Sequence, residues 1–182
     1  MSIFDDSILL SIRQEIISFV DAEERVLSTQ FKKGIYFMPE IALVYGVGKA
    51  IVSNAKNIFP SRQVEWSREI QVGEDGPCDL VLDVIGGGQI VLEFKTMHRK
   101  YESYEHDIVK LKNLVGDQRT RLFCALSYVY EKKAPEGDER IQQLEHNHAT
   151  SIRRIGNLHN FATWVNYTGE RVHCVIGLWE VF

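Results

Sequence analysis

The stretch Gly76–Thr96, GPCDLVLDVIGGGQIVLEFKT, decides the fold that this chain is expected to adopt. Residues 79–85 and 89–95 are rich in the β-branched and large apolar residues that favour strands. The three glycines at 86–88 supply the positive backbone φ that a hairpin turn requires. The stretch therefore predicts two antiparallel strands joined by a tight turn.

Charged residues inside this hairpin point to a chemistry. Glu93 and Lys95 are two residues apart, so their side chains project from the same face of a strand. If the turn is centred on Gly87, Asp79 lies opposite Lys95 on that face, whereas a one-residue slip in register moves Asp79 to the other face. Two carboxylates and an ammonium group clustered in this way indicate a site for a hard divalent cation such as Mg²⁺, which prefers carboxylate oxygens and keeps several waters.

An Asp on one strand followed by Glu-x-Lys on the next resembles the motif of the PD-(D/E)XK nuclease superfamily. The proline-aspartate pair of that motif is imperfect here, because Cys78 separates Pro77 from Asp79. The predicted order over residues 40–130, a helix, three strands, a helix and a strand, is also similar to the core of that superfamily. The resemblance implies an α/β fold of the restriction-endonuclease-like type: a three-layer α/β/α sandwich with a central mixed sheet, core order αβββαβ and an added N-terminal helix.

Length and composition suit a single domain. The chain has 182 residues, of which 45% are apolar and 25% charged, and it is long enough to bury a sizeable core. We expect one nuclease-like domain over residues 1–182. Within it we expect a helical extension at 1–30, a core at 37–130, and C-terminal helices and a strand at 137–182.

Apolar periodicity predicts the individual elements. One or two helices are expected over residues 3–30, and further helices over residues 40–56, 104–115, 139–147 and 151–166. Strands are expected over residues 62–72, 79–85, 89–95, 121–130 and 172–182. The near-continuous apolar run at 121–130 predicts a central strand that is buried on both faces.

Charge and cysteine content exclude little. The net charge of −4 is not by itself typical of a nucleic-acid-binding protein, but a metal-dependent nuclease can be acidic overall because the metal restores positive charge locally. Three widely spaced cysteines (Cys78, Cys124 and Cys174) indicate buried, reduced thiols in a cytoplasmic protein. Asp5 and Asp6 stand where a signal peptide carries basic residues, and no apolar run approaches a membrane span, so no membrane partner is expected.

The resemblance assigns roles to individual residues. Asp79 and Glu93 would hold one Mg²⁺ or Mn²⁺ together with the backbone carbonyl of Phe94. Lys95 would orient the attacking water and stabilise the pentavalent phosphate. Glu40 lies in the first turn of a predicted helix, where two interpretations stay open: a favourable carboxylate at the positive helix end, or a further catalytic and metal-binding group of the kind this superfamily often carries there.

Basic residues follow the Glu-x-Lys strand. From Lys95 to Arg121, seven basic residues stand against four acidic ones, with tyrosines interleaved. The residues expected to contact a phosphate backbone or to stack on bases are Arg99, Lys100, Tyr101 and Lys110. The alternative for this stretch is a solvated helix face with no ligand.

The sequence thus predicts a Mg²⁺-dependent deoxyribonuclease that hydrolyses phosphodiester bonds, with DNA as its partner. A homodimer is the simplest assembly for cutting both strands of a duplex. The alternative, from another functional class, is a non-catalytic module that binds nucleic acid or protein on a nuclease-like fold. Metal binding discriminates between the two, because a decayed site does not take Mn²⁺ tightly.

Overall fold

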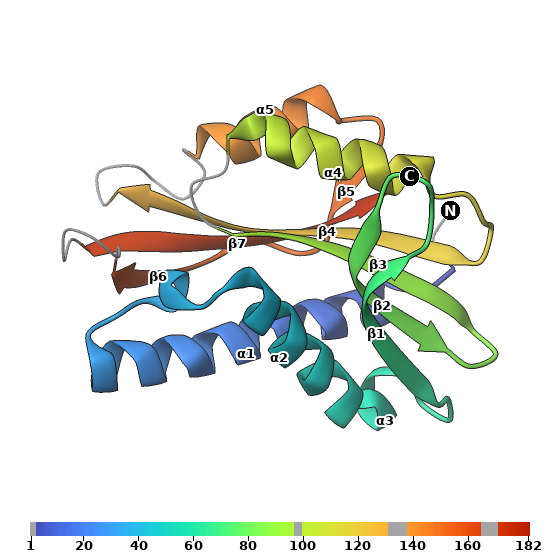
Figure 1. The fold of residues 1–182 in the computed structure, drawn as a ribbon, viewed down its shortest axis with the longest axis horizontal. Helices are drawn as coiled ribbons and strands as arrows, with labels where there is room; N and C mark the ends of the chain where they lie inside the picture. The colour runs from blue at the N-terminus through green and yellow to red at the C-terminus, as the bar shows by residue number, and fades with distance from the viewer. Residues whose placement is uncertain (1–2, 97–99, 131–137, 165–170) are drawn as a thin grey trace.

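The computed structural model describes residues 3–96, 100–130, 138–164 and 171–182, which form an α/β fold on one mixed seven-stranded sheet (Figure 1). The helices are α1 (Asp6–Phe31), the 3₁₀ turn η1 (Ile35–Phe37), α2 (Glu40–Ser53), α3 (Ala55–Ile58), α4 (Tyr101–Asn113) and α5 (Glu139–Asn147). The strands are β1 (Val64–Gln71), β2 (Pro77–Val84), β3 (Gly88–Thr96), β4 (Arg119–Tyr130), β5 (Ile152–Arg154), β6 (His159–Trp164) and β7 (Arg171–Val181).

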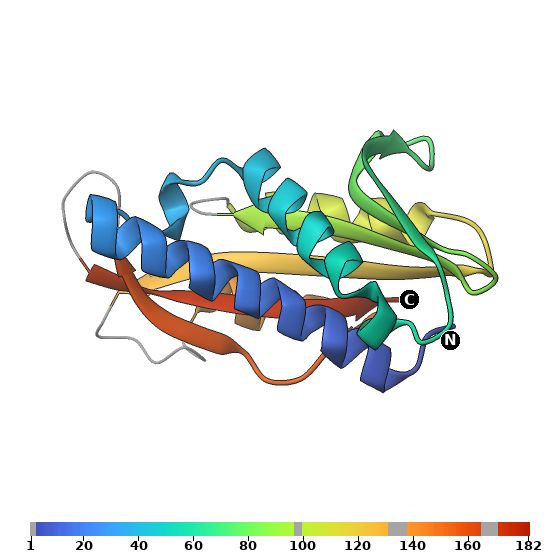
Figure 2. The ribbon, with the colours of Figure 1, turned by 90° about the horizontal axis from the view of Figure 1, so that it is seen from below.

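Helices cover both faces of the sheet. α1 and α2 lie on one face and α4 and α5 on the other (Figure 1). Figure 2 shows α1 and α2 side by side on the first of these faces. In β3 and β4 the even-numbered apolar residues pack toward α1 and α2, while the odd-numbered ones pack toward α4 and α5. β4 is therefore buried on both faces, which confirms the prediction for residues 121–130.

The strand order is β1-β2-β3-β4-β7, and β5 and β6 share the far edge of β7. β3 and β4 pair in parallel, and the other strand pairs are antiparallel. Two parallel strands cannot be joined by a tight turn, so the chain must cross over one face of the sheet between them. α4 is that crossover, and its position over β3 and β4 follows from it.

The predicted β2–β3 hairpin forms, but its register differs from the predicted one. The turn is centred on Gly86, with Leu80 opposite Leu92. Continued by one residue, this register sets Asp79 across from Glu93, two residues short of the predicted partner. Because the difference is an even number of residues, regular alternation would keep Asp79 on the predicted face. However, Cys78 packs toward α4 and Leu80 toward α1 and α2, so the alternation of β2 is broken at Asp79.

The N-terminal helix is part of the main core. α1 spans 26 residues, and its buried side chains Leu9, Ile12, Ile16 and Val20 join the apolar cluster formed with α2 and the sheet. Its apolar stripe therefore packs inside the chain and is not the face that a second subunit would contact.

The prediction of a helix over residues 151–166 is wrong. Residues 152–154 and 159–164 are strands β5 and β6, and both pair with β7. Between them, the Ile155 N–H donates to the Leu178 carbonyl at 2.8 Å. The free edge of β7 supplies hydrogen bonds that outweigh a local helical pattern, and that edge lies far away in the sequence. The end of the predicted helix, residues 165–166, lies outside the described residues.

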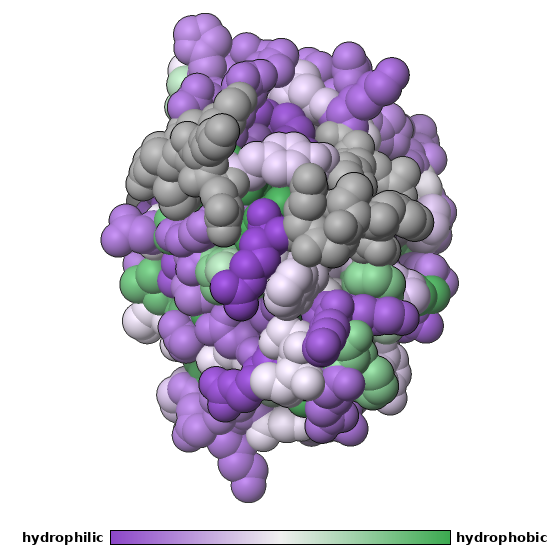
Figure 3. All heavy atoms as spheres, turned by 90° about the vertical axis from the view of Figure 1, so that its left-hand side faces the viewer, coloured by the Kyte–Doolittle hydropathy of each residue, from purple (hydrophilic) through white to green (hydrophobic). Residues whose placement is uncertain are grey.

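One end of the molecule has a mostly polar surface. Figure 3 shows the end of the molecule where β4 finishes and β7 begins, and its surface is mostly hydrophilic with scattered apolar patches. No helix within the described ranges is long and apolar enough to cross a membrane. Cys78, Cys124 and Cys174 are buried free thiols, as the sequence predicted.

Two glycines with nearly the same positive φ allow a test of the packing at the β2–β3 turn. Gly76 has a φ of 101° and Gly88 a φ of 102°. A Cβ at Gly76 would meet nothing within 4 Å, whereas one at Gly88 would lie 2.8 Å from the Gln118 carbonyl oxygen and would also overlap Ile3. We expect Gly76→Ala to lower the free energy of unfolding by about 1 kcal/mol, through strain at positive φ alone. Gly88→Ala should lower it by about 1 to 3 kcal/mol more, because the backbone must also move. Urea denaturation measures both losses, and equal losses would contradict this description of the turn.

Candidate functional site

Two strands and one helix bring charged side chains together near the end of β3. Asp79 comes from β2, Glu93 and Lys95 from β3, and Glu40 from the first turn of α2. Burial alone would lower the pKa of Lys95, but a hydrogen bond and the charge of Asp107, together with the charges of Glu40 and Asp79, raise that pKa overall. The charge of Asp79 likewise acts on Glu93. The four residues predicted as catalytic therefore share one electrostatic neighbourhood.

Glu40 is attached to the end of β3. Its Oε2 accepts hydrogen bonds from the Thr96 N–H at 2.9 Å and from the Thr96 hydroxyl at 3.1 Å. Pro39 precedes the helix, so Glu40 stands in the first turn, where a carboxylate also interacts favourably with the helix dipole. The contact places this half-buried carboxylate one residue beyond Lys95 along β3.

The Asp79 side chain accepts a backbone hydrogen bond just beyond the end of the β2–β3 ladder. The last pair of that ladder is Leu80 with Leu92. Beyond it, the Phe94 N–H donates to Asp79 Oδ2 at 2.8 Å. Asp79 is therefore held directly against β3 by its own side chain. The metal-binding role expected for the Phe94 carbonyl stays a prediction.

Helix α4 supplies two further charged residues. Lys95 Nζ lies 2.8 Å from Asp107 Oδ2, and Lys110 Nζ lies 2.7 Å from Glu93 Oε1. Lys110 also donates to the backbone carbonyl of Pro77. Residues three apart lie on the same side of a helix, so Asp107 and Lys110 both face the strands. Glu93 and Lys95, the two charged residues at the end of β3 itself, thus each have an opposite charge on α4.

Sequence reasoning missed Asp107 and placed Lys110 differently. Only 4% of Asp107 and 7% of Lys110 is exposed. Lys110 was expected to be a cation facing nucleic acid, but its ammonium group lies inside the molecule against Glu93. The available signal was position: both residues fall on the inward stripe of the helix, next to Ile108 and Leu111. Buried charged residues require oppositely charged or hydrogen-bonding partners, and Glu93 and Lys95 on β3 were the available charged partners in the sequence.

The other residues expected to bind nucleic acid lie around the start of α4. Lys100 is exposed and directly precedes the helix. Tyr101 is half-buried, and its hydroxyl accepts a hydrogen bond from Asn147 Nδ2 at 3.0 Å. Arg99 lies outside the described residues.

Glu93 is the most deeply buried acid of the cluster, with 2% of its surface exposed. Burial and the negative charge of Asp79 raise the pKa of Glu93 to about 7, against the opposing effect of the hydrogen bond from Lys110. Burial, with the charge of Glu93, also raises the pKa of the neighbouring Cys78 to about 12. Cys78 is therefore a thiol at neutral pH, and thiolate chemistry has no support here.

The carboxylates of the cluster have the donor type that a hard cation prefers, but they do not form a closed cage. Within the part of the chain that the structure describes, no three His, Cys, Asp or Glu side chains stand close enough to hold a metal. Asp79 and Glu40 each bind a backbone N–H, and Glu93 binds an ammonium group. Each carboxylate has two oxygens with several lone pairs, so these contacts leave capacity for a further ligand. Cation binding would thus require the predicted ligands to move closer together.

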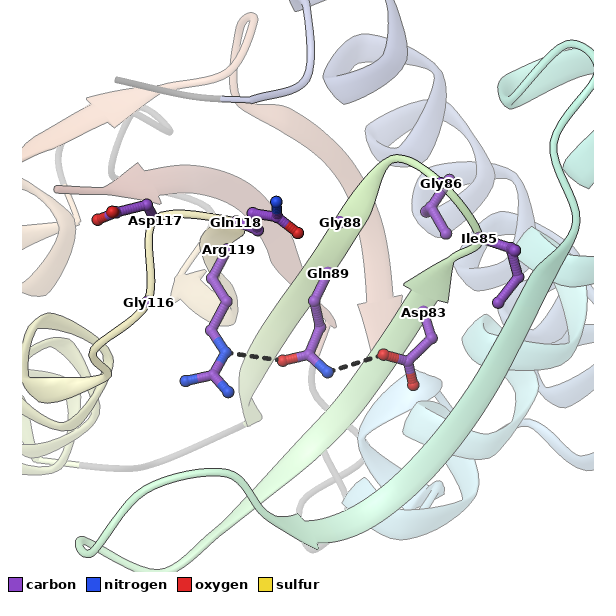
Figure 4. Close-up of a pocket in the computed structure, with 10 residues that line it drawn as sticks. Asp83, Ile85, Gly86, Gly88, Gln89, Gly116, Asp117, Gln118 and Arg119 are labelled. Carbon is purple, nitrogen blue, oxygen red and sulfur yellow. Dashed lines mark hydrogen bonds between the residues drawn. The ribbon is translucent and has the colours of Figure 1, made fainter.

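A hollow of about 650 Å³ lies at the other end of β3, beside the β2–β3 turn and the loop before β4. Three of its polar side chains, from Asp83, Gln89 and Arg119, bind one another (Figure 4). Arg119 Nε donates to Gln89 Oε1 at 2.9 Å, and Gln89 Nε2 donates to Asp83 Oδ1 at 2.8 Å. These bonds join three strands at the start of β3, whereas the acid–lysine cluster lies near its end. The hollow is therefore separate from the candidate site.

Comparisons of this chain with protein-family models, with curated proteins and with solved structures find no match. The interpretation of the site accordingly depends on its own residues and their geometry.

The raised pKa of Glu93 predicts how the stability of the metal-free protein depends on pH. In the unfolded chain Glu93 loses its proton near the ordinary value of 4.5, whereas in the folded protein it keeps the proton up to about 7. The folded state binds more protons in this interval, so the free energy of unfolding should fall as the pH rises through it, by roughly 1 to 3 kcal/mol.

Urea denaturation in the presence of EDTA, at about pH 5 and about pH 8, measures this effect. Glutamine does not titrate, so the stability difference between the wild-type protein and Glu93→Gln should change between the two pH values, with the wild type losing more. A difference that is the same at both would contradict the assignment.

Proposed function

We propose that this protein is a nuclease that uses Mg²⁺ or Mn²⁺ to hydrolyse phosphodiester bonds of DNA, on a fold of the restriction-endonuclease-like type. The observation that carries the proposal is the convergence of Glu40, Asp79, Glu93 and Lys95 near the end of β3. The run α2, β1, β2, β3, α4, β4 gives supporting context, since its order resembles the αβββαβ core of the PD-(D/E)XK superfamily once the short α3 is set aside.

The charges of the cluster favour a divalent cation. The carboxylates of Glu40, Asp79, Glu93 and Asp107, when ionised, outnumber the ammonium groups of the two lysines by two charges. One Mg²⁺ would balance that excess, and oxygen ligands are the ones it prefers. Asp79 and Glu93, with the Phe94 carbonyl, would hold the ion, and Glu40 would complete the set. Once bound, Mg²⁺ lowers the pKa of a coordinated water and offsets charge on the phosphate.

Lys95 suits the role of an electrostatic catalyst. Because the pKa of Lys95 is raised by Asp107 and the neighbouring carboxylates, its ammonium group stays charged at neutral pH. The contact with Asp107 at 2.8 Å restrains that group beside the acids. A fixed positive charge there would orient the attacking water and stabilise the negative charge that develops on the phosphate.

The start of α4 is the proposed contact with DNA. Lys100 offers an exposed cation for a phosphate, and Tyr101 offers a ring next to it. The protein has one such site in each chain, so a homodimer would place two sites on a duplex.

Cleavage assays test the proposal on labelled single-stranded, duplex and branched DNA and on RNA, with Mg²⁺ or Mn²⁺. We expect metal-dependent cutting by the wild-type protein and a loss of roughly 100-fold or more in Lys95→Ala, because one stabilising charge at the phosphate is removed. Glu93→Gln should lose activity as well. Lys56→Ala, an exposed lysine on α3, is the matched control and should cut at the wild-type rate.

Circular dichroism of each variant separates lost chemistry from lost fold. Undiminished cutting by a folded Lys95→Ala protein would overturn the assignment. If the folded wild-type protein cut none of these substrates and did not bind Mn²⁺, the non-catalytic binding module would replace the nuclease.

A further inference from the structure

The Glu93–Lys110 pair is the most enclosed ion pair of the candidate site. The side chains of Glu93 and Lys110 are 2% and 8% exposed, and the atoms that pair, Oε1 and Nζ, are 2.7 Å apart. In the proposed nuclease, Glu93 is also a ligand of the divalent cation. The Glu93 carboxylate could thus bind either of two cations: the ammonium group of Lys110 or the divalent ion.

The Lys110 ammonium group and a divalent ion would repel each other if both contacted Glu93. An ammonium group in contact with the carboxylate adds positive charge next to the place where a divalent ion would bind, and like charges repel strongly in a poorly solvated site. Binding of the ion would therefore weaken the Glu93–Lys110 contact, and by the same coupling the contact must weaken binding of the ion.

Lys110 has a second hydrogen-bond acceptor that it can keep when it leaves Glu93. Its Nζ also donates to the carbonyl of Pro77, the first residue of β2. The lysine side chain is a flexible four-carbon stem, so it can keep the carbonyl while it moves away from the carboxylate. Its displacement would not leave a buried ammonium group without any acceptor, which is the arrangement that would forbid the exchange.

We propose that Lys110 is an internal cation that occupies Glu93 in the metal-free protein, and that a divalent cation binds by displacing it. The inference rests on the proposed function, since it requires the cation site at Glu93. It also explains why the acids interact electrostatically, yet no three of them among the described residues form a metal-binding group. In the metal-free protein Glu93 contacts Lys110 on α4, while Asp79 and Glu40 accept hydrogen bonds from the backbone of β3.

The alternative is that Lys110 simply neutralises and orients Glu93 and so helps the metal to bind. The two possibilities predict opposite signs for the effect of removing the ammonium group. A competitor lowers metal affinity, so its removal must raise it. A helper raises metal affinity, so its removal must lower it.

The test is Mn²⁺ affinity, measured by isothermal titration calorimetry or electron paramagnetic resonance, in the wild-type protein, Lys110→Met and Lys112→Met. Methionine keeps the length of the lysine stem without the charge. We expect Lys110→Met to bind Mn²⁺ at least about tenfold more tightly than the wild type. Lys112 is two residues along on α4, where its ammonium group contacts His148, so Lys112→Met should bind like the wild type.

A second variant guards against misfolding. Lys110→Met leaves Glu93 buried without its partner in the absence of metal, and this can destabilise the fold. Lys110→Gln removes the charge but keeps an N–H donor for Glu93 and Pro77, and it should show the same direction of change. For either variant, Mn²⁺ should raise the melting temperature by more than it does for the wild type.

Equal or weaker Mn²⁺ binding by both Lys110 variants, with clear binding by the wild type, would overturn the inference and leave the proposed function standing. Tight Mn²⁺ binding by the Lys110 variants alone would support the inference and would mean that Lys110 prevents the wild-type protein from binding Mn²⁺. If none of the proteins bound Mn²⁺, the inference and the metal-dependent nuclease would fall together.

Discussion

Buried charge near the end of β3 must be paired, and α4 supplies the partners. Glu93 is buried and Lys95 partly buried on one side of the strand, and Asp107 and Lys110 contact them from the helix. An unpaired charge in such a place is strongly destabilising, so strand and helix cannot shift independently. The parallel pairing of β3 with β4 requires a crossover, and α4 is that crossover. The connection that builds the sheet is therefore also the one that completes the charged cluster.

The end of the β2–β3 hairpin shows how the same cluster is linked to the backbone. Asp79 accepts the Phe94 N–H at the point where the ladder stops, and Glu40 accepts the Thr96 N–H from the other side of the sheet. Two acids thus act as hydrogen-bond acceptors for β3 while they line the cluster. A cluster built this way is attached to the sheet at each of these acids, so small movements of the strand end would move them together.

Several parts of this arrangement could be predicted because they depend on neighbours in the chain. The hairpin and the shared face of Glu93 and Lys95 follow from a glycine turn and from period-two alternation. The burial of β4 on both faces follows from its near-continuous apolar run. The predicted partner of Asp79 was wrong, because the turn is centred on Gly86 and the alternation of β2 is broken at Asp79. The prediction for the stretch 151–166 was also wrong, since its strands form only on the edge of β7.

By itself, the sequence determined the hairpin and the shared face of Glu93 and Lys95, because these follow from local backbone geometry. Only the tertiary structure decided what those charges contact. Whether Lys110 faces solvent or Glu93 depends on how α4 is rotated over the sheet, and that rotation is set by apolar packing of residues distant in the chain. Pairing between a strand and a helix leaves no periodic signal in either segment, so it becomes visible only once the two are packed together.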